Sequence, residues 1–185
     1  MQAVCYNNVM KDAYLDIETT GLSPGDCKIT IIGIHLSDGI EDGFVQLVGD
    51  EITPDNLLAA LAGVKTIHTY NGSRFDMPFI AARLGVDLTR DFDHCDLMYD
   101  CWRNNLYGGL KRVERTLGIA RRLVDINGLE AVRLWWRYEN DYDREALRIL
   151  CEYNREDVVN LKTLKEKVVA MAGVGMDKAP DCGTG

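Results

Sequence analysis

The sequence lacks a long hydrophobic run. Among its 185 residues, no stretch approaches the roughly 18 consecutive apolar residues that a membrane-spanning helix needs. Residues 1–5 have neither the basic patch nor the apolar run that is typical of a signal peptide. We therefore expect a cytoplasmic protein. A chain of this length can form one well-buried domain but not two comfortable ones.

Paired cysteines are also absent from the sequence. Its six cysteines include no C-x-x-C pair, and its three histidines, His35, His68 and His94, lie singly in or beside apolar runs. In a chain without an export signal, such cysteines are expected to be reduced thiols that pack as small hydrophobic side chains. Each histidine is expected in the core or at a strand edge rather than as a metal ligand.

The chain has no excess of positive charge. Its formal net charge of −8 argues at first against a polyanionic partner. A metal site lined by carboxylates, however, places several negative charges in one small region. Basic residues also gather between residues 103 and 137. Charge alone favours a solvated basic face, and it does not decide the function.

The hydrophobic pattern predicts strands first and helices later. Short segments rich in apolar and β-branched residues predict strands at residues 13–17, 28–36, 44–48, 64–70 and 91–95. The short links between the first three strands favour an antiparallel meander.

Capping signals define the predicted helices. Thr53 and Pro54 predict the start of a helix that Gly63 stops, and Gly85 closes a helix over residues 78–84. Beyond residue 96 the pattern is almost wholly helical, and its last helix covers residues 143–171. We expect residues 1–172 to form one α/β domain on a mixed sheet, and residues 173–185 to be a flexible tail.

Asp16 and Glu18 are two residues apart on the first predicted strand. Their side chains would therefore leave the same face of that strand. A buried carboxylate is costly unless a positive charge or a metal ion accompanies it. The alternative is that the strand ends at Ile17, which would leave both acids exposed in a turn.

Two further acids lie where helices are expected. Asp76 follows the fourth predicted strand at the start of a helix, where a carboxylate commonly acts as a cap. Tyr153 and Asp157 are one turn apart on the last helix and share a face, which by itself is typical of an exposed surface. Together, four acids from strands and helices could converge on two divalent cations, an arrangement that hydrolyses phosphodiesters.

These segments resemble the three motifs of the DEDD exonuclease superfamily, which is DnaQ-like and ribonuclease H-like. Residues 15–22 (LDIETTGL) resemble the first motif, residues 70–76 (YNGSRFD) the second, and Tyr153-x-x-x-Asp157 the third. Glu152 stands where the histidine branch would have its histidine, so the chain resembles the tyrosine branch, DEDDy. The amino-acid sequences of these motifs are most similar to those of the predicted ribonuclease-H-like exonucleases of the YprB type.

The resemblance implies a three-layer ribonuclease H-like fold with a five-stranded mixed sheet flanked by helices. It also implies a 3′→5′ exonuclease that uses two divalent cations, Mg²⁺ or Mn²⁺, and releases 5′-mononucleotides from DNA or RNA. The partner would be nucleic acid with a single-stranded 3′ end. Asp16 would bridge both cations, Glu18 and Asp157 would complete one site, and Asp76 would hold the second cation. Tyr153 would orient the attacking water.

The same resemblance implies a substrate-binding set. Thr19 and Thr20 would contact the 3′-terminal nucleotide, and Leu22 would wedge against its base. Asn71 and Phe75 would contact the substrate or support the site, although Asn71 could equally be a turn residue and Phe75 a core residue.

Two alternative functions remain open at this point. The first is a catalytically weak nucleic-acid-binding module on the same fold, because a fold does not fix a function. Loss of a metal-site acid would mark such a module, and all four acids are present. The second is an enzyme restricted to short oligonucleotides, which the acidic charge and small size would suit.

Overall fold

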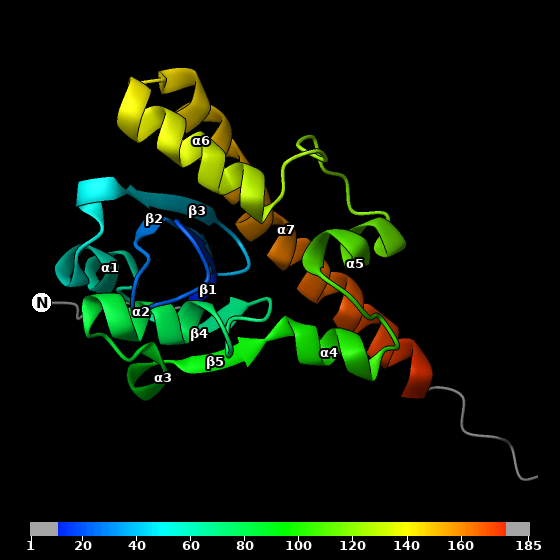
Figure 1. Cartoon of the computed structure of the whole chain (residues 1–185). Coiled ribbons are helices and arrows are strands. Elements are labelled where there is room, and N and C mark those ends of the chain that lie inside the picture. Colours follow the sequence, from blue (N-terminus) through cyan, green and yellow to red (C-terminus); the bar gives the residue numbers. More distant parts are fainter. Residues whose placement is uncertain (1–10, 177–185) are drawn as a thin grey trace, which may run out of the picture.

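The computed structural model describes residues 11–176, with side chains as far as residue 172. Its centre is a five-stranded sheet with the strand order β3-β2-β1-β4-β5 (Figure 1). The strands are β1 (Lys11–Thr19), β2 (Ile29–Ser37), β3 (Asp42–Val48), β4 (Val64–Thr69) and β5 (Asp93–Asp96).

The sheet is mixed, as the sequence predicts. β1, β2 and β3 form an antiparallel meander, whereas β4 runs parallel to β1 and β5 runs parallel to β4. A loop over residues 20–28 joins β1 to β2, and a short turn over residues 38–41 joins β2 to β3, so the three strands follow one another in the meander. The parallel strands are reached through helices, which a parallel crossover needs.

Seven α-helices and one 3₁₀ turn, η1 (Gly49–Glu51), complete the described part of the chain. The helices are α1 (Pro54–Ala60), α2 (Asp76–Leu84), α3 (Leu88–Asp91), α4 (Leu97–Arg103), α5 (Leu110–Leu117), α6 (Gly128–Asp141) and α7 (Arg144–Met176).

Most predicted helix ends are where their capping residues place them. The Thr53 side chain accepts a hydrogen bond from Asn56 at the start of α1. Gly85 ends α2 in a left-handed conformation, with φ 68°, which costs glycine little. The last helix differs from its prediction, because α7 continues to Met176 rather than to residue 171. The remainder of the predicted tail lies outside the described residues.

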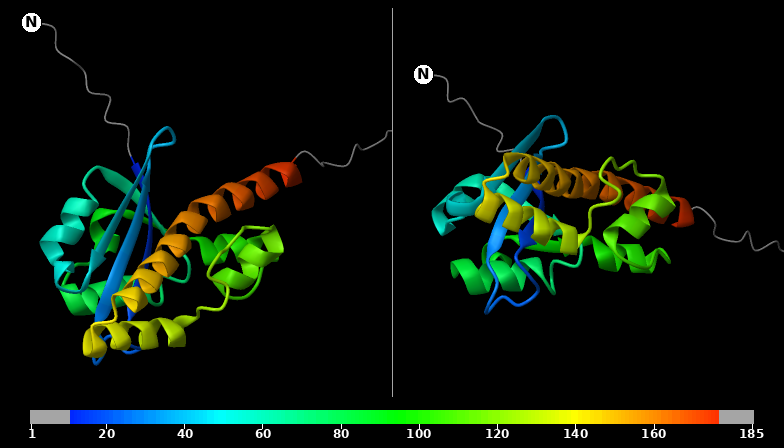
Figure 2. Two further views of the ribbon diagram at one scale, coloured as in Figure 1. Left: turned by 90° about the horizontal axis from the view of Figure 1, so that it is seen from above. Right: turned by 45° about the horizontal axis from the view of Figure 1, so that its top comes forward.

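Helices cover both faces of the sheet, which gives three layers (Figure 2). One face packs against α1, α2 and α3 through a core that includes Leu15, Ile32 and Phe79. On the other face, α7 crosses the strands and α4, α5 and α6 pack beside it, with Leu161 and Leu150 in two further apolar clusters. The predicted ribonuclease H-like architecture is therefore confirmed. Over residues 11–176, no helix combines the length and apolar character that crossing a membrane requires.

Candidate active site

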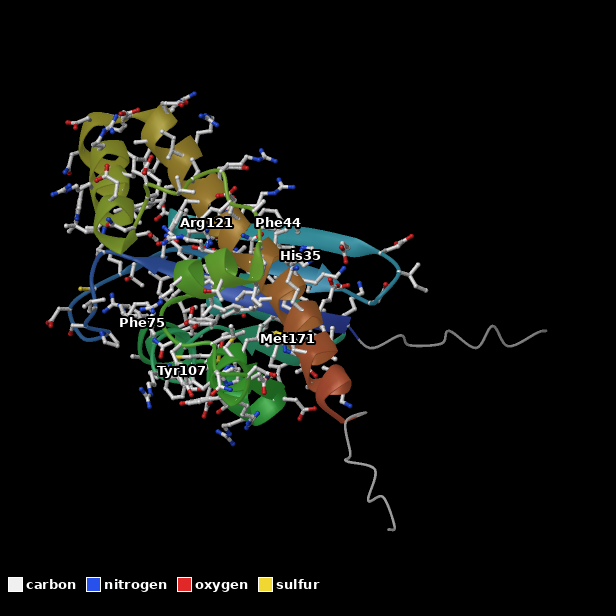
Figure 3. The ribbon with its side chains drawn as sticks, turned by 90° about the vertical axis from the view of Figure 1, so that its right-hand side faces the viewer. His35, Phe44, Phe75, Tyr107, Arg121 and Met171 are labelled. Carbon is white, nitrogen blue, oxygen red and sulfur yellow. The ribbon has the colours of Figure 1, made fainter. Side chains whose placement is uncertain are left out.

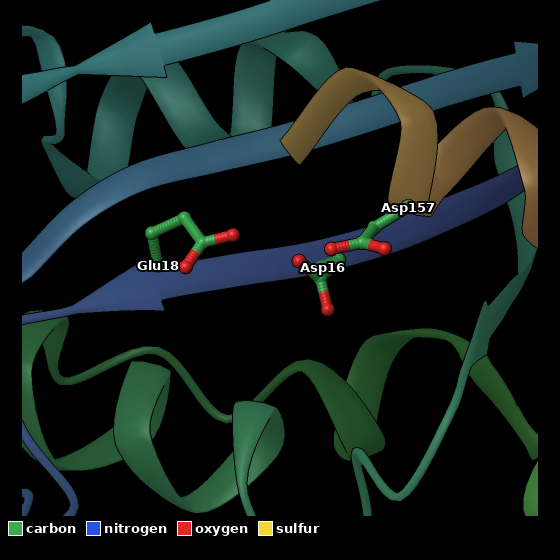
Figure 4. A group of neighbouring side chains, drawn as sticks. All are labelled: Asp16, Glu18 and Asp157. Atoms are coloured by element: carbon green, nitrogen blue, oxygen red, sulfur yellow. The ribbon is translucent and has the colours of Figure 1, made fainter. Parts of the chain in front are cut away.

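Three carboxylates meet where α7 crosses the central strand. Asp16 and Glu18 extend from β1, and Asp157 extends from α7 toward them (Figure 4). Each offers an oxygen, and these oxygens all lie within 4.8 Å of one another. β1 continues to Thr19, so the alternative in which the strand ends at Ile17 is wrong. Alternation along the strand puts both β1 acids on the same face.

Burial and mutual repulsion make the three acids harder to ionise than acids in water. Burial, followed by the charge of Asp157, raises the pKa of Asp16 and of Glu18 well above the usual range. Burial also raises the pKa of Asp157 to about 6, although the neighbouring Arg121 lowers it. A divalent cation would remove this repulsion, because hard cations prefer carboxylate oxygens. The donor set and its spacing therefore fit a divalent metal ion.

Asp76 lies beside this group rather than within it. Its Oδ1 accepts a hydrogen bond of 3.1 Å from the backbone N–H of Ile17, between the two β1 acids. Burial raises the pKa of Asp76 to about 7. It does not cap α2, since the N-cap residue is Phe75. Asp76 faces the same cavity as the three clustered acids, so a second cation could use its other oxygen.

Asn154 holds Asp16 in place, although no pattern in the sequence singles it out. Its Nδ2 donates to the Asp16 backbone oxygen at 3.2 Å and to Asp16 Oδ2 at 3.1 Å. Gln46 Nε2 donates in turn to Asn154 Oδ1 at 2.9 Å. This contact requires Gly33 on β2, because a Cβ there would lie 2.2 Å from Asn154 Oδ1. The missing side chain of Gly33 lets α7 approach the sheet at Asp16.

Tyr153 lies one turn before Asp157 and lines the same site. Only 7% of it is exposed, and burial raises the pKa of its hydroxyl far above the usual value. The phenol is therefore neutral throughout the physiological pH range. The Lys111 Nζ lies 4.4 Å from the centre of the Tyr153 ring, and this amine has no hydrogen-bond partner among the described side chains.

Glu114 and Arg121, which likewise belong to none of the sequence motifs, adjoin Asp157. Arg121 lies alongside α7 and donates to Asp157 and to Glu114 (Figure 3). Of the basic residues clustered between residues 103 and 137, Arg121 is the one that contacts a candidate metal ligand directly.

Two cavities open from the acidic group. One, of about 350 Å³, is lined by the acids together with Thr19, Leu22, Asn71 and Phe75. Leu22 is 85% exposed. The other cavity, of about 330 Å³, is lined by Lys111 and Arg112. Asp16, Tyr70, Gly128, Tyr153 and Asp157 line both cavities, so the two meet at the acids.

The two predicted threonines differ in their surroundings. The Thr19 hydroxyl donates to the Gly21 oxygen at 2.7 Å, at the edge of the first cavity. The Thr20 hydroxyl accepts from the Lys28 backbone at 3.0 Å, which braces the loop after β1. Thr20 is not among the residues that line either cavity.

Asn71 and Phe75 combine the two roles that the sequence left open. Asn71 has a left-handed backbone, with φ 64°, and Phe75 packs on Phe79 with ring centres 5.3 Å apart. Both side chains nevertheless line the first cavity. Asp96 holds their loop, because its carboxylate accepts from the backbone of Asn71 at 2.7 Å and of Ser73 at 3.1 Å.

The sequence profile of the RNase_H superfamily matches residues 13–169, which include every residue of this site. The chain belongs to the RNase_H superfamily. An uncharacterized protein of Methanocaldococcus jannaschii is 32% identical over 169 residues, which cover 80% of this chain and 90% of that protein. The uncharacterized protein YprB of Bacillus subtilis is 25% identical over 168 residues, which cover 82% of this chain and 40% of YprB.

Solved structures show the same superfamily fold at lower sequence identity. The family B DNA polymerase of Pyrobaculum calidifontis superposes with a TM-score of 0.65 and 19% identity, over 86% of this chain and 24% of the polymerase. NrnC of Brucella melitensis bound to pGG superposes with a TM-score of 0.62 and 20% identity, over 92% of this chain and 77% of NrnC. The chain thus spans about a quarter of the polymerase and less than half of YprB.

Proposed function

We propose that this protein is a metal-dependent 3′→5′ exonuclease of the DEDDy type that hydrolyses DNA or RNA to 5′-mononucleotides. The observation that carries the proposal is the convergence of Asp16, Glu18 and Asp157, with Asp76 and Tyr153 at the same cavity. Oxygen donors at this spacing suit two Mg²⁺ or Mn²⁺ ions. Such ions would activate a water molecule and neutralise charge on the phosphate.

The acids would divide the metal binding among them. Asp16, at the centre of the group, would contact both ions, and Glu18 and Asp157 would complete one ion site. Asp76 would bind the other ion through the oxygen that Ile17 does not use. Asn154 would keep the Asp16 carboxylate in one orientation. Catalysis that depends on the precise placement of reacting groups requires such a fixed ligand.

Tyr153 would orient the attacking water without accepting its proton. A buried phenol whose pKa is raised is a poor base at neutral pH, but it can donate or accept a hydrogen bond. Its place one helical turn from Asp157 puts the ring next to the acids. This role matches what the tyrosine branch of the resemblance implies.

The two cavities would bind the strand on either side of the scissile bond. The terminal nucleotide would occupy the cavity of Leu22 and Phe75, where an apolar side chain can pack on a base. Thr19 and Asn71 would support that end of the strand, and Thr20 would brace the loop that carries Leu22. The preceding phosphates would lie toward Lys111 and Arg112, whose positive charges offset the acidity of the site.

The wider setting of the enzyme follows from the same proposal. Residues 11–176 would be a single catalytic domain, acting in the cytoplasm. The likeness to YprB, at 25% identity, supports a YprB-type assignment.

End-labelled strands test the proposal. Single-stranded DNA and RNA, labelled at the 5′ or the 3′ end, are incubated with Mg²⁺ or Mn²⁺. A 5′ label should give a ladder that shortens one nucleotide at a time, whereas a 3′ label should leave at once as a mononucleotide. The Asp157→Asn variant is the control for a contaminating nuclease and should be inactive. Wild-type protein that is inert on every strand with both metals would exclude the enzyme.

A preference for short oligonucleotides is a second candidate. NrnC, which shares the fold, is described bound to pGG, and each cavity of this chain is small, at about 330 and 350 Å³. Turnover of a dinucleotide compared with a strand of about 20 nucleotides distinguishes the two. A kcat/KM for the dinucleotide that is far above that for the longer strand would favour the short-substrate enzyme. A value for the dinucleotide that is equal or lower would exclude it.

A further inference from the structure

A buried ion network joins α5 to α7 immediately behind the acidic group. Arg121 follows α5 and donates from Nε to Glu114 Oε2 and from Nη2 to Glu114 Oε1, both at 2.8 Å. The same Nη2 also donates to Asp157 Oδ1. The side chains of Arg121, Glu114 and Asp157 are 5%, 2% and 7% exposed.

Glu114 is itself fixed from α7. Asn160, one turn after Asp157, donates from Nδ2 to Glu114 Oε1 at 2.9 Å and to the Ala120 backbone oxygen at 3.2 Å. The guanidinium is planar and its donors form a rigid fork, so two contacts to Glu114 set the direction in which it meets Asp157. Arg121 therefore has little freedom to turn away.

The two oxygens of Asp157 have different surroundings. Oδ1 accepts from Arg121, whereas Oδ2 has no hydrogen-bond donor among the described residues. Asp157 also belongs to the three-acid group, whose oxygens lie within 4.8 Å of one another. A carboxylate with one oxygen held from behind can offer the other oxygen to a cation. Partners of this kind orient metal ligands and commonly affect metal affinity.

We propose that Arg121 is a positioning residue that makes Asp157 a one-oxygen ligand of the metal centre. This inference rests on the proposed function, since it assigns a partner to one of its ligands. Glu114 has a specific part in the arrangement, because its charge offsets that of Arg121. The pair thus fixes Asp157 without adding net positive charge beside the cation site.

Stability alone does not account for the network. Taking charged groups out of water costs about as much as their attraction returns, so buried ion pairs contribute little net stability compared with apolar packing. The pair also lies against a candidate ligand rather than elsewhere in the core. A positioning role gives a reason for both features.

Manganese binding in the absence of nucleic acid tests the inference. Arg121→Lys keeps the positive charge but loses the fork, so it changes orientation more than local charge. Isothermal titration calorimetry should show a Kd for Mn²⁺ about tenfold to a hundredfold weaker than in the wild type, the range for loss of an outer partner. Glu114→Gln, which removes one of the two acceptors that anchor Arg121 and the charge that compensates it, should weaken Mn²⁺ binding in the same direction.

A matched control lies at the other end of β1. Lys165 on α7 pairs with Asp12, away from the acidic group, and also contacts His68. Lys165→Met should lower the melting temperature but leave the Kd for Mn²⁺ unchanged. It therefore separates general loss of stability from loss of ligand orientation. If Arg121→Lys does not fold, Asn160→Ala takes its place, because it loosens Glu114, the anchor of Arg121, without changing any charge.

Each outcome decides the inference. Folded variants at Glu114 and Arg121 that bind Mn²⁺ as the wild type does would show a purely structural pair and overturn it. Tighter Mn²⁺ binding would also overturn it, since Arg121 would then compete with the cation for Asp157. A wild-type protein that binds no Mn²⁺ would instead refute the metal centre and the proposed function with it.

Discussion

Gly33→Ala should damage the site through a single methyl group. Gly33 pairs with Asp16 across the β1–β2 ladder, and a Cβ at Gly33 would lie 2.2 Å from Asn154 Oδ1. Asn154 is fully buried, and its carbonyl oxygen already accepts from Gln46. It cannot withdraw without breaking its bonds to Gln46 and Asp16, so the substitution should displace the residue that orients Asp16.

The expected stability loss follows from two opposing contributions. Overpacking a buried contact costs about 1–3 kcal/mol. Replacing glycine by alanine within a strand returns about 0.5–1 kcal/mol. The net loss is about 0–2.5 kcal/mol, which corresponds to a melting temperature lower by up to about 10 °C in a domain of this size. Loss of the Asn154 contact should also lower nuclease turnover by roughly tenfold to a hundredfold.

Gly43 provides the matched control. It lies on β3, and a Cβ there would meet the Leu36 Cβ at 3.6 Å, an ordinary contact. Urea unfolding and exonuclease rate are measured for Gly33→Ala and Gly43→Ala side by side. Gly43→Ala should keep the wild-type turnover and gain about 0.5–1 kcal/mol of stability, because it meets only ordinary contacts. Equal stability and equal turnover in the two variants would refute the role given to Asn154.

Three further predictions concern the acids and the tyrosine. Tyr153→Phe should bind Mn²⁺ normally but lose turnover by roughly ten- to a thousandfold in single-turnover assays. If the variant turns over at the wild-type rate, Tyr153 is a packing residue only. Mn²⁺ at a hundredfold excess over its Kd should stabilise the wild type by about 2.7 kcal/mol in thermal unfolding. Asp16→Ala should reduce this gain, and an equal gain in both proteins would show that Asp16 is not a ligand. Burial raises the pKa of Asp76 to about 7, so between about pH 4 and 7 the folded state binds a proton that the unfolded state has released. Raising the pH from 5 to 8 in EDTA should therefore lower the free energy of unfolding, and Asp76→Asn should lessen that fall. If the free energy of unfolding falls equally with pH in the wild type and in Asp76→Asn, the raised pKa of Asp76 is contradicted.

Local patterns in the sequence predicted much of the fold. Caps such as Thr53 and Gly85 mark helix ends because their side chain or left-handed backbone acts on neighbouring residues. The spacing of Asp16 and Glu18 on a strand places both on one face for a similarly local reason. Predictions of this kind depend on residues a few positions apart, and the structure agrees with them.

Contacts between distant segments were not predictable in the same way. Arg121 meets Asp157 across 36 positions, and Asn154 meets Asp16 across 138. No periodicity marks such pairs, because they depend on how α7 crosses the sheet. The backbone contact from Ile17 to Asp76 likewise replaces the helix cap that local reasoning favoured. The Gly33 position becomes meaningful only when Asn154 lies over it.

A circular substrate tests most directly that the acidic group hydrolyses strands from a free end. One single-stranded sequence is prepared in linear form and as a covalently closed circle, and mononucleotide release is followed with Mn²⁺ and with EDTA. We expect the linear strand to be degraded to 5′-mononucleotides only with Mn²⁺, while the circle stays intact. Cleavage of the circle, or a linear strand that survives Mn²⁺, would contradict it.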